Sequence, residues 1–232
     1  MVCPYALARA RGNNPLHGSC FRLVAHTTII ELPTESVNNL IHLEDNMLTV
    51  GVAMLQGARH EHMHSVLSAA EKLGLQVKIR ELRKSSDIEG IDAVILPGGE
   101  STAMKIASKS EKLFSSLWKE ISEDKFPVLG TCAGAILLSQ QELIQTKIVR
   151  NAFGRQKESF QSEIRVEIGE SNSFQGVFIR APRFKEGSDF PIAWLKDEVV
   201  GVKEGRIMAL TFHPELTTDT RFHEWLLTEA IN

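Results

Sequence analysis

The sequence predicts an α/β fold, a three-layer sandwich in which helices flank a mostly parallel central sheet. Two observations predict it. From Met47 to about residue 146, short apolar stretches alternate with stretches of helical spacing. Two of the apolar stretches, Asp92–Leu96 and Pro127–Leu129, have the character of strands buried within a sheet. Strands that alternate with helices at this interval form βαβ units, with parallel strands and helices on both faces.

The elements follow in order along the chain. The helix expected over Gly57–Leu73, for example, places Met63, Val66 and Ala70 on one apolar face. After Thr146 the stretches become shorter and typical of strands, and a closing helix is expected over Thr220–Ala230. The remaining helices are expected over Ser101–Ala107, Glu111–Ile121 and Ala133–Gln141. The strands are expected over Leu48–Leu55, Gln76–Ile79, Asp92–Leu96, Pro127–Leu129, Lys147–Val149, Ser162–Ile168, Gly176–Ile179, Ile192–Leu195, Val199–Val202 and Ile207–Phe212.

Residues 1–46 differ from the rest of the chain. They contain no acidic residue before Glu31, and their arginines stand among Gly, Asn and Pro without helical or strand period. One interpretation is a disordered or non-native extension, translated ahead of a start at Met47. The other is an organelle-targeting segment. We favour the extension because arginine is sparse and no amphipathic face emerges, and we take residues 47–232 as the functional domain.

Composition narrows the class of partners. The net charge of −3 and the pI near 6.3 give no sign of the basic face that nucleic acids or membrane surfaces require. Three widely spaced cysteines match neither a disulfide framework nor a zinc site. We therefore expect a cytoplasmic protein with no metal, no cofactor and no membrane span, in which Cys132 is a free thiol.

The sequence Gly130-Thr-Cys132-Ala-Gly134 lies between a buried strand and a helix. A nucleophile on such a turn needs small neighbours, because the backbone is strained and the substrate must approach closely. The helix N-terminus favours a thiolate, and the N–H of Ala133 would point at an oxyanion. A buried, inert cysteine is the alternative, and the small flanking residues make it the weaker one.

Two further motifs follow strands. In Leu96-Pro-Gly-Gly-Glu-Ser-Thr102, adjacent glycines can turn a backbone N–H toward a ligand, so Gly99 is a second oxyanion donor, while Glu100 suits a substrate ammonium group. A tight turn capped by Ser101 is the alternative. In Phe212-His-Pro-Glu-Leu216, His213 has the pKa of a general base, and Glu215 can orient its ring.

The other seven histidines are interpreted as surface residues or as satisfied core residues. Three of them alternate along one expected helix, where side chains two positions apart diverge, so a metal site is not expected there. These seven are His17, His26, His42, His60, His62, His64 and His223.

Two arginines are candidates for binding a carboxylate. The guanidinium group is a planar fork that suits a substrate carboxylate, so Arg150 or Arg180 could hold an α-carboxylate. Surface arginines in ion pairs are an equally good interpretation from spacing alone.

Taken in order, these motifs resemble a known family. LPGGEST, GTCAG, RNAFGRQ, VFIRAP and FHPEL, from Leu96 to Leu216, are similar to the glutaminase subunits of pyridoxal 5′-phosphate synthases. These subunits are class I, triad-type glutamine amidotransferases with a flavodoxin-like fold. The resemblance covers Met47 to the C-terminus.

The resemblance implies hydrolysis of L-glutamine to glutamate and ammonia, with the ammonia passed to a (β/α)₈-barrel synthase subunit. It implies Cys132 as nucleophile, His213 as base and acid, and Glu215 as the residue that orients His213. Family members are poorly active alone, and docking to the synthase arranges the oxyanion loop. The glutamine pocket would comprise Gly99, Glu100, Ser101, Arg150, Ile179 and Arg180, and Gln56 would face the synthase.

This chain departs from the family pattern in two places. The first 46 residues have no counterpart, and the segment between Cys132 and Arg150 is shorter than usual. Two alternatives within enzymes are a glutaminase that serves another synthase and a cysteine peptidase of similar fold. An alternative outside enzymes is a non-catalytic subunit that senses glutamine, which the intact set of Cys132, His213 and Glu215 disfavours.

Overall fold

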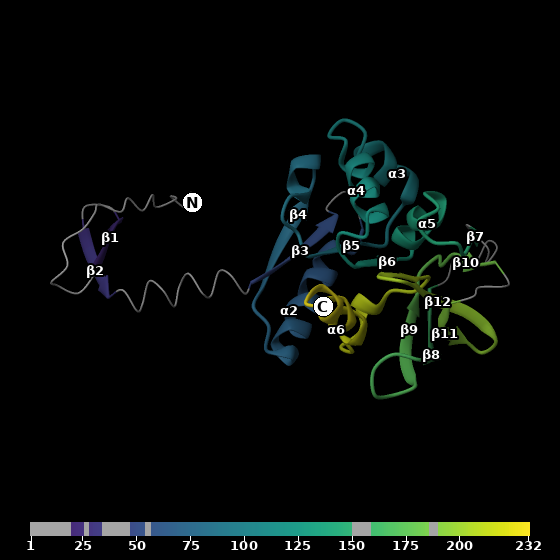
Figure 1. The fold of residues 1–232 in the computed structure, drawn as a ribbon. Helices are drawn as coiled ribbons and strands as arrows, with labels where there is room; N and C mark the ends of the chain where they lie inside the picture. Colours follow the sequence, from purple (N-terminus) through teal and green to yellow (C-terminus); the bar gives the residue numbers. More distant parts are fainter. Residues whose placement is uncertain (1–19, 26–27, 34–46, 54–56, 150–158, 186–189) are drawn as a thin grey trace. The chain divides into compact units, whose positions relative to one another are not determined.

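The structure, a computed structural model of the 232-residue chain, describes residues 20–25, 28–33, 47–53, 57–149, 159–185 and 190–232. The chain divides into two compact units, Met1–Met47 and Leu48–Asn232. Figure 1 shows the elements of each unit.

The first unit contains a pair of antiparallel strands, β1 (Cys20–Ala25) and β2 (Thr28–Pro33). The sequence pattern predicts no regular element in this region, so this pair of strands differs from the expectation. Its physical basis is composition, because both strands are rich in β-branched and aromatic residues that favour extended backbone. The interpretation of residues 1–46 as a non-native extension stays a prediction.

The second unit is built on a nine-stranded mixed sheet, in the order β4-β3-β5-β6-β13-β12-β11-β8-β9. The first five strands in this order run parallel, and the last four continue the sheet with antiparallel pairing. The parallel part is β4 (Val77–Leu82), β3 (Leu48–Ala53), β5 (Ala93–Leu96), β6 (Val128–Thr131) and β13 (Ile207–Leu210). The antiparallel part is β12 (Glu198–Glu204), β11 (Pro191–Leu195), β8 (Phe160–Val166) and β9 (Ser173–Phe178).

Helices cover the two faces of this sheet and form two separate apolar cores (Figure 1). Helices α2 (Arg59–Leu73) and α6 (Arg221–Ala230) pack in one core, and α3 (Ser101–Ala107), α4 (Leu113–Ser122) and α5 (Ala133–Gln140) pack in the other. Strand β5 shows the alternation, since Ala93 and Ile95 face the first core while Val94 and Leu96 face the second. The predicted three-layer α/β sandwich is confirmed.

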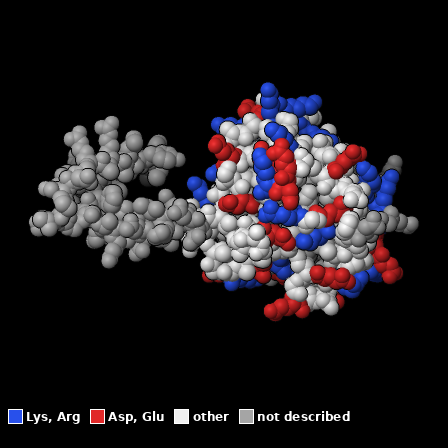
Figure 2. Space-filling view, viewed as in Figure 1, with Lys and Arg blue, Asp and Glu red and all other residues white. Residues whose placement is uncertain are grey.

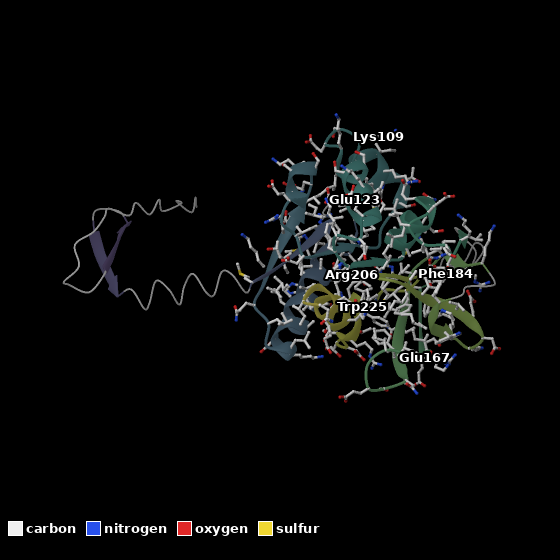
Figure 3. The ribbon with its side chains drawn as sticks, viewed as in Figure 1. Lys109, Glu123, Glu167, Phe184, Arg206 and Trp225 are labelled. Carbon is white, nitrogen blue, oxygen red and sulfur yellow. The ribbon has the colours of Figure 1, made fainter. Side chains whose placement is uncertain are left out.

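Smaller elements complete the unit. They are the 3₁₀ turns η1 (Ser85–Ile88) and η2 (Pro214–Leu216), and the paired strands β7 (Ile148–Val149) and β10 (Arg183–Phe184). The C-terminal end of α6 is held from the turn before β13, where the guanidinium of Arg206 donates to the Glu229 carbonyl at 2.9 Å. Figure 3 shows Arg206 beside this helix, close to Trp225, whose indole donates to the Glu229 side chain. A basic side chain at this position satisfies a free helix carbonyl.

The surface mixes both signs of charge. On the face shown in Figure 2, Lys and Arg lie interspersed with Asp and Glu over the second unit. None of the helices in the described parts of the chain has the length and apolar character that crossing a bilayer demands.

A cluster of four phenylalanine rings lies beneath the strand that leads to the FHPEL motif. Phe212 is fully buried, and its ring centroid lies 5.7 Å from that of Phe174, 5.8 Å from that of Phe178 and 5.5 Å from that of Phe222. Tilted and edge-on arrangements at these distances are favourable for aromatic rings. The cluster therefore fixes the backbone immediately before His213.

We predict that Phe212→Ala lowers the free energy of unfolding by about 3–5 kcal/mol, because it removes a fully buried ring and leaves a cavity. Ile106→Ala is the matched control, since this side chain is 64% exposed and its truncation should cost under about 0.5 kcal/mol. Urea unfolding followed by circular dichroism measures both. Equal losses in the two variants would contradict the assignment of Phe212 to the core.

Candidate active site

Cys132 lies at the junction between strand β6 and helix α5. Its backbone adopts φ 46° and ψ −100°, a region that residues other than glycine rarely occupy. The backbone N–H of Cys132 donates to the Leu210 carbonyl on β13 at 2.8 Å, which holds this conformation. The side chain is buried and lies at the N-terminus of α5, where the helix dipole favours a thiolate. The predicted strained turn between strand and helix is present.

The start of helix α5 packs directly against the end of strand β5. A Cβ atom on Gly134 would lie 2.0 Å from the carbonyl oxygen of Leu96, so no larger residue fits there. The sequence pattern explains the small neighbours of Cys132 by substrate access and backbone strain. For Gly134 the structure adds a packing reason, because the helix must touch the strand to place Cys132 at the sheet edge.

The turn after strand β13 carries His213 and Glu215. Nδ1 of His213 lies 2.7 Å from Oε1 of Glu215, and both side chains are buried. The backbone N–H of His213 donates to the Val177 carbonyl on β9 at 2.8 Å. Because a carboxylate accepts hydrogen bonds, we assign a proton to Nδ1 of His213, which leaves Nε2 for Cys132.

Cys132 and His213 line the same cleft. Burial alone would lower the pKa of His213, yet its interactions with Cys132 and Glu215 raise it to about 10. The imidazole of His213 therefore holds a proton at neutral pH. A cysteine paired with a histidine in this way is an arrangement suited to nucleophilic catalysis by sulfur.

The loop after strand β5 passes beneath the histidine ring. A Cβ atom on Gly98 would lie 2.3 Å from Cε1 of His213, so glycine is required for this approach. The first glycine of the Gly98-Gly99 pair thus makes room for the imidazole of His213, which the motif alone does not predict. Gly99, with φ of 150°, lines the cleft next to it.

A cleft of about 860 Å³ opens above these groups. It brings together residues from several segments that are far apart in the sequence, and the sulfur of Cys132 lies 3.9 Å from the carbonyl oxygen of Ile179 at its wall. Arg180, next to it, has a left-handed backbone with φ of 47°. The predicted site residues that line the cleft are Gly99, Glu100, Ser101, Cys132, Ile179, Arg180 and His213.

Comparison with known proteins gives the family. Residues 52–232 match the model of the SNO glutamine amidotransferase family. This chain belongs to that family. Curated relatives named pyridoxal 5′-phosphate synthase subunit PdxT include one from Thermococcus onnurineus, 43% identical over 199 residues, and one from Listeria innocua, 37% identical over 195 residues. Each match covers 80% of this chain and 100% of the relative.

Solved structures agree with this family on the fold. A glutamine amidotransferase crystal structure is 39% identical, covers 79% of this chain and 99% of its own, and superposes with a TM-score of 0.68. The structure of PurLQS from Thermotoga maritima is 16% identical and covers 80% of this chain and 98% of its own. Its TM-score of 0.56 shows the fold alone.

Two of the predicted family residues, Arg150 and Gln56, lie outside the described residues. The segment before Arg150, which the resemblance predicts to be shorter than usual, is described as far as residue 149. The carboxylate of Glu204 accepts from the backbone N–H groups of Gln145 and Thr146, at 2.6 and 3.1 Å, and from the Thr146 hydroxyl at 2.8 Å. One side chain of β12 therefore holds this connection in place.

A set of buried polar residues behind Glu215 was not predicted from the sequence. His62 and His223, interpreted as surface or satisfied core residues without a role, are fully buried, and His62 contacts Glu215 and Thr131. The available signal was that His62 shares the buried face of its helix with Val66 and Ala69. The described residues include no group of three or more His, Cys, Asp or Glu suited to a metal.

We predict that Cys132→Ala lowers the pKa of His213, because the hydrogen bond and the negative charge of the sulfur both raise it in the unmodified protein. Ring NMR titration of the ¹⁵N-labelled histidines measures the midpoint. Ser108→Ala, a buried residue outside the lining of the cleft, is the control and should leave the midpoint unchanged. The same midpoint in Cys132→Ala as in the unmodified protein would show that the sulfur does not act on the ring.

Proposed function

We propose that this chain hydrolyses L-glutamine to L-glutamate and ammonia, as the glutaminase subunit of a pyridoxal 5′-phosphate synthase. The observation that carries the proposal is that Cys132 and His213 line one cleft, with Glu215 hydrogen-bonded to His213 behind them. The names of the curated PdxT relatives, whose whole length the match covers, support the pyridoxal phosphate branch over another synthase.

The reaction follows from the order of these groups. The Cys132 thiolate attacks the carboxamide carbon of glutamine and forms a C–S bond. His213, protonated beside it, gives its proton to the departing nitrogen, so the C–N bond breaks and ammonia leaves a thioester. His213 then takes a proton from water, whose oxygen attacks the thioester. The C–S bond breaks, and glutamate and the thiolate are released. Glu215 keeps the ring in one tautomer throughout.

Two backbone N–H groups are proposed to stabilise the tetrahedral oxyanion. Ala133 is the first residue of α5, so its N–H has no acceptor within the helix. Gly99 lines the same cleft from the loop after β5. Removing one oxyanion donor typically slows an acyl transfer by about 10²–10³.

Recognition of glutamine is proposed to use charged side chains for the ammonium and carboxylate groups on its α-carbon. Glu100 would bind the ammonium group, and Arg180, with Arg150, would bind the carboxylate. Ser101 and Ile179, which also line the cleft, would contact the rest of the substrate. The positions of Glu100 and Arg180 on the same cleft support this assignment.

The proposed partner is a (β/α)₈-barrel synthase subunit that receives the ammonia, in the cytoplasm. Gln56 is proposed to face it. The residue that follows, Gly57, lines the cleft, so a partner bound there would be next to the oxyanion loop. Incubation with such a synthase, followed by a glutamine-dependent assay for pyridoxal phosphate, tests this choice of partner.

We predict that Cys132→Ala abolishes glutamate formation from glutamine in the presence of the synthase, because no other group forms the thioester. The measurement is glutamate released over time. A glutamine analogue with an electrophilic diazoketone should label the unmodified protein at Cys132 and leave the variant unlabelled.

His64→Ala is the control for this experiment, since His64 is an exposed residue of α2 outside the lining of the cleft. It should retain full activity. If Cys132→Ala still produced glutamate at the normal rate, the proposed roles would be wrong.

We predict that Glu100→Gln raises KM for glutamine by about 10-fold or more and changes kcat little, because it removes a charge-assisted bond to the substrate ammonium. Steady-state kinetics with the synthase present measures both constants. Glu111→Gln, a carboxylate outside the lining of the cleft, is the matched control. An unchanged KM would remove Glu100 from the pocket.

A further inference from the structure

We propose that His62 is a positioning residue for glutamine hydrolysis, which holds the Glu215 carboxylate from the side opposite His213, while His223 fixes the tautomer of His62. This inference rests on the proposed function. It is carried by a buried chain of side chains behind the triad, none of which lines the cleft.

The two oxygens of Glu215 have different surroundings. Oε1 accepts from His213, whereas Oε2 has no well-aligned hydrogen bond among the described residues. Nε2 of His62 lies 3.3 Å from Oε2 and 3.0 Å from Oγ1 of Thr131. A buried carboxylate oxygen needs a positive dipole close to it, and His62 is placed to provide one.

The protonation of the chain follows from its contacts. A lone pair on Nε2 of His62 would face a carboxylate oxygen at 3.3 Å and be repelled, so we assign the proton to Nε2. Nδ1 of His62 is then an acceptor, and Nε2 of His223, 2.9 Å away, must donate to it. This leaves Nδ1 of His223 with a lone pair, and that buried atom is one without a hydrogen-bond partner. In this tautomer, Nδ1 of His223 carries no hydrogen, so no buried N–H is left without an acceptor at that atom.

The charges agree with this assignment. Burial lowers the pKa of His62, and it lowers that of His223 to about 3, so both rings are neutral near pH 7. Burial by itself would raise the pKa of Glu215, but His62 and the hydrogen bond from His213 lower it overall. With Nε2 protonated 3.3 Å from Oε2, neutral His62 supports the carboxylate as a dipole, and the negative charge stays available to His213.

The chain also connects separate elements. His62 comes from the first turn of α2, His223 from α6, Thr131 from the end of β6 and Glu215 from η2. The residue after Thr131 is Cys132. Through these contacts, the helices on one face of the sheet hold the orienting acid of a site built at the sheet edge.

Two matched substitutions separate positioning from packing. His62→Gln places an amide N–H near the position of Nε2 and can still face Glu215. His62→Asn is shorter, so its amide reaches only the position of Nδ1 and keeps the contact to His223 alone. The assay is glutamate release by the full chain with its synthase, with kcat and KM determined separately.

We expect His62→Asn to lower kcat about 10-fold to 100-fold with KM changed less than about twofold, and His62→Gln to stay within about threefold of the unmodified protein. In a Glu215→Gln background, His62→Asn should lower kcat by a further factor of less than about two, because the carboxylate that His62 supports is gone. His64→Asn, an exposed residue on the same helix, is the control.

The outcomes are distinguishable. No glutamate from the unmodified chain and its synthase would overturn the proposed function itself. Normal activity in that sample, with equal kcat for His62→Asn and His62→Gln, would overturn the positioning role alone. An undiminished effect of His62→Asn in the Glu215→Gln background would also overturn it, because a purely structural loss does not depend on the carboxylate.

Discussion

The site depends on one buried charge, the carboxylate of Glu215. Burial opposes this charge, and neighbouring histidines on two sides compensate for it, so that the pKa of Glu215 stays below its ordinary value. With that charge present, His213 keeps its proton beside Cys132. Without it, the pKa of His213 would fall, since burial lowers this pKa and Glu215 raises it. The protonation of His213 therefore depends in part on an acid that lies outside the lining of the cleft.

Sheet topology explains why these groups meet. The loops with Gly98, Cys132 and His213 follow β5, β6 and β13, which are neighbours in the sheet and run parallel. Parallel neighbours end at the same edge, and binding sites of α/β proteins form at this carboxyl edge. Close packing then completes the geometry. Gly98 admits the histidine ring, and Gly134 lets the helix of Cys132 start against β5.

Membership of the glutamine amidotransferase family covers residues 52–232. Within that range, the segment before Arg150 is held by Glu204, which accepts hydrogen bonds from Gln145 and Thr146. Glu204 is the last residue of β12 and lies outside the lining of the cleft. This segment is thus stabilised by one carboxylate outside the cleft.

The sequence alone determined the order of strands and helices and the parallel part of the sheet, and it predicted Cys132, His213 and Glu215 as a triad. It could do so because apolar periodicity and glycine-flanked motifs are local properties. The tertiary structure decided what depends on residues far apart in the chain. Sequence periodicity did not reveal that β8, β9, β11 and β12 extend the sheet in antiparallel fashion, because pairing partners are not encoded locally. Nor did it reveal the proposed role of His62. This role depends on contacts with side chains that three other elements bring against its helix face.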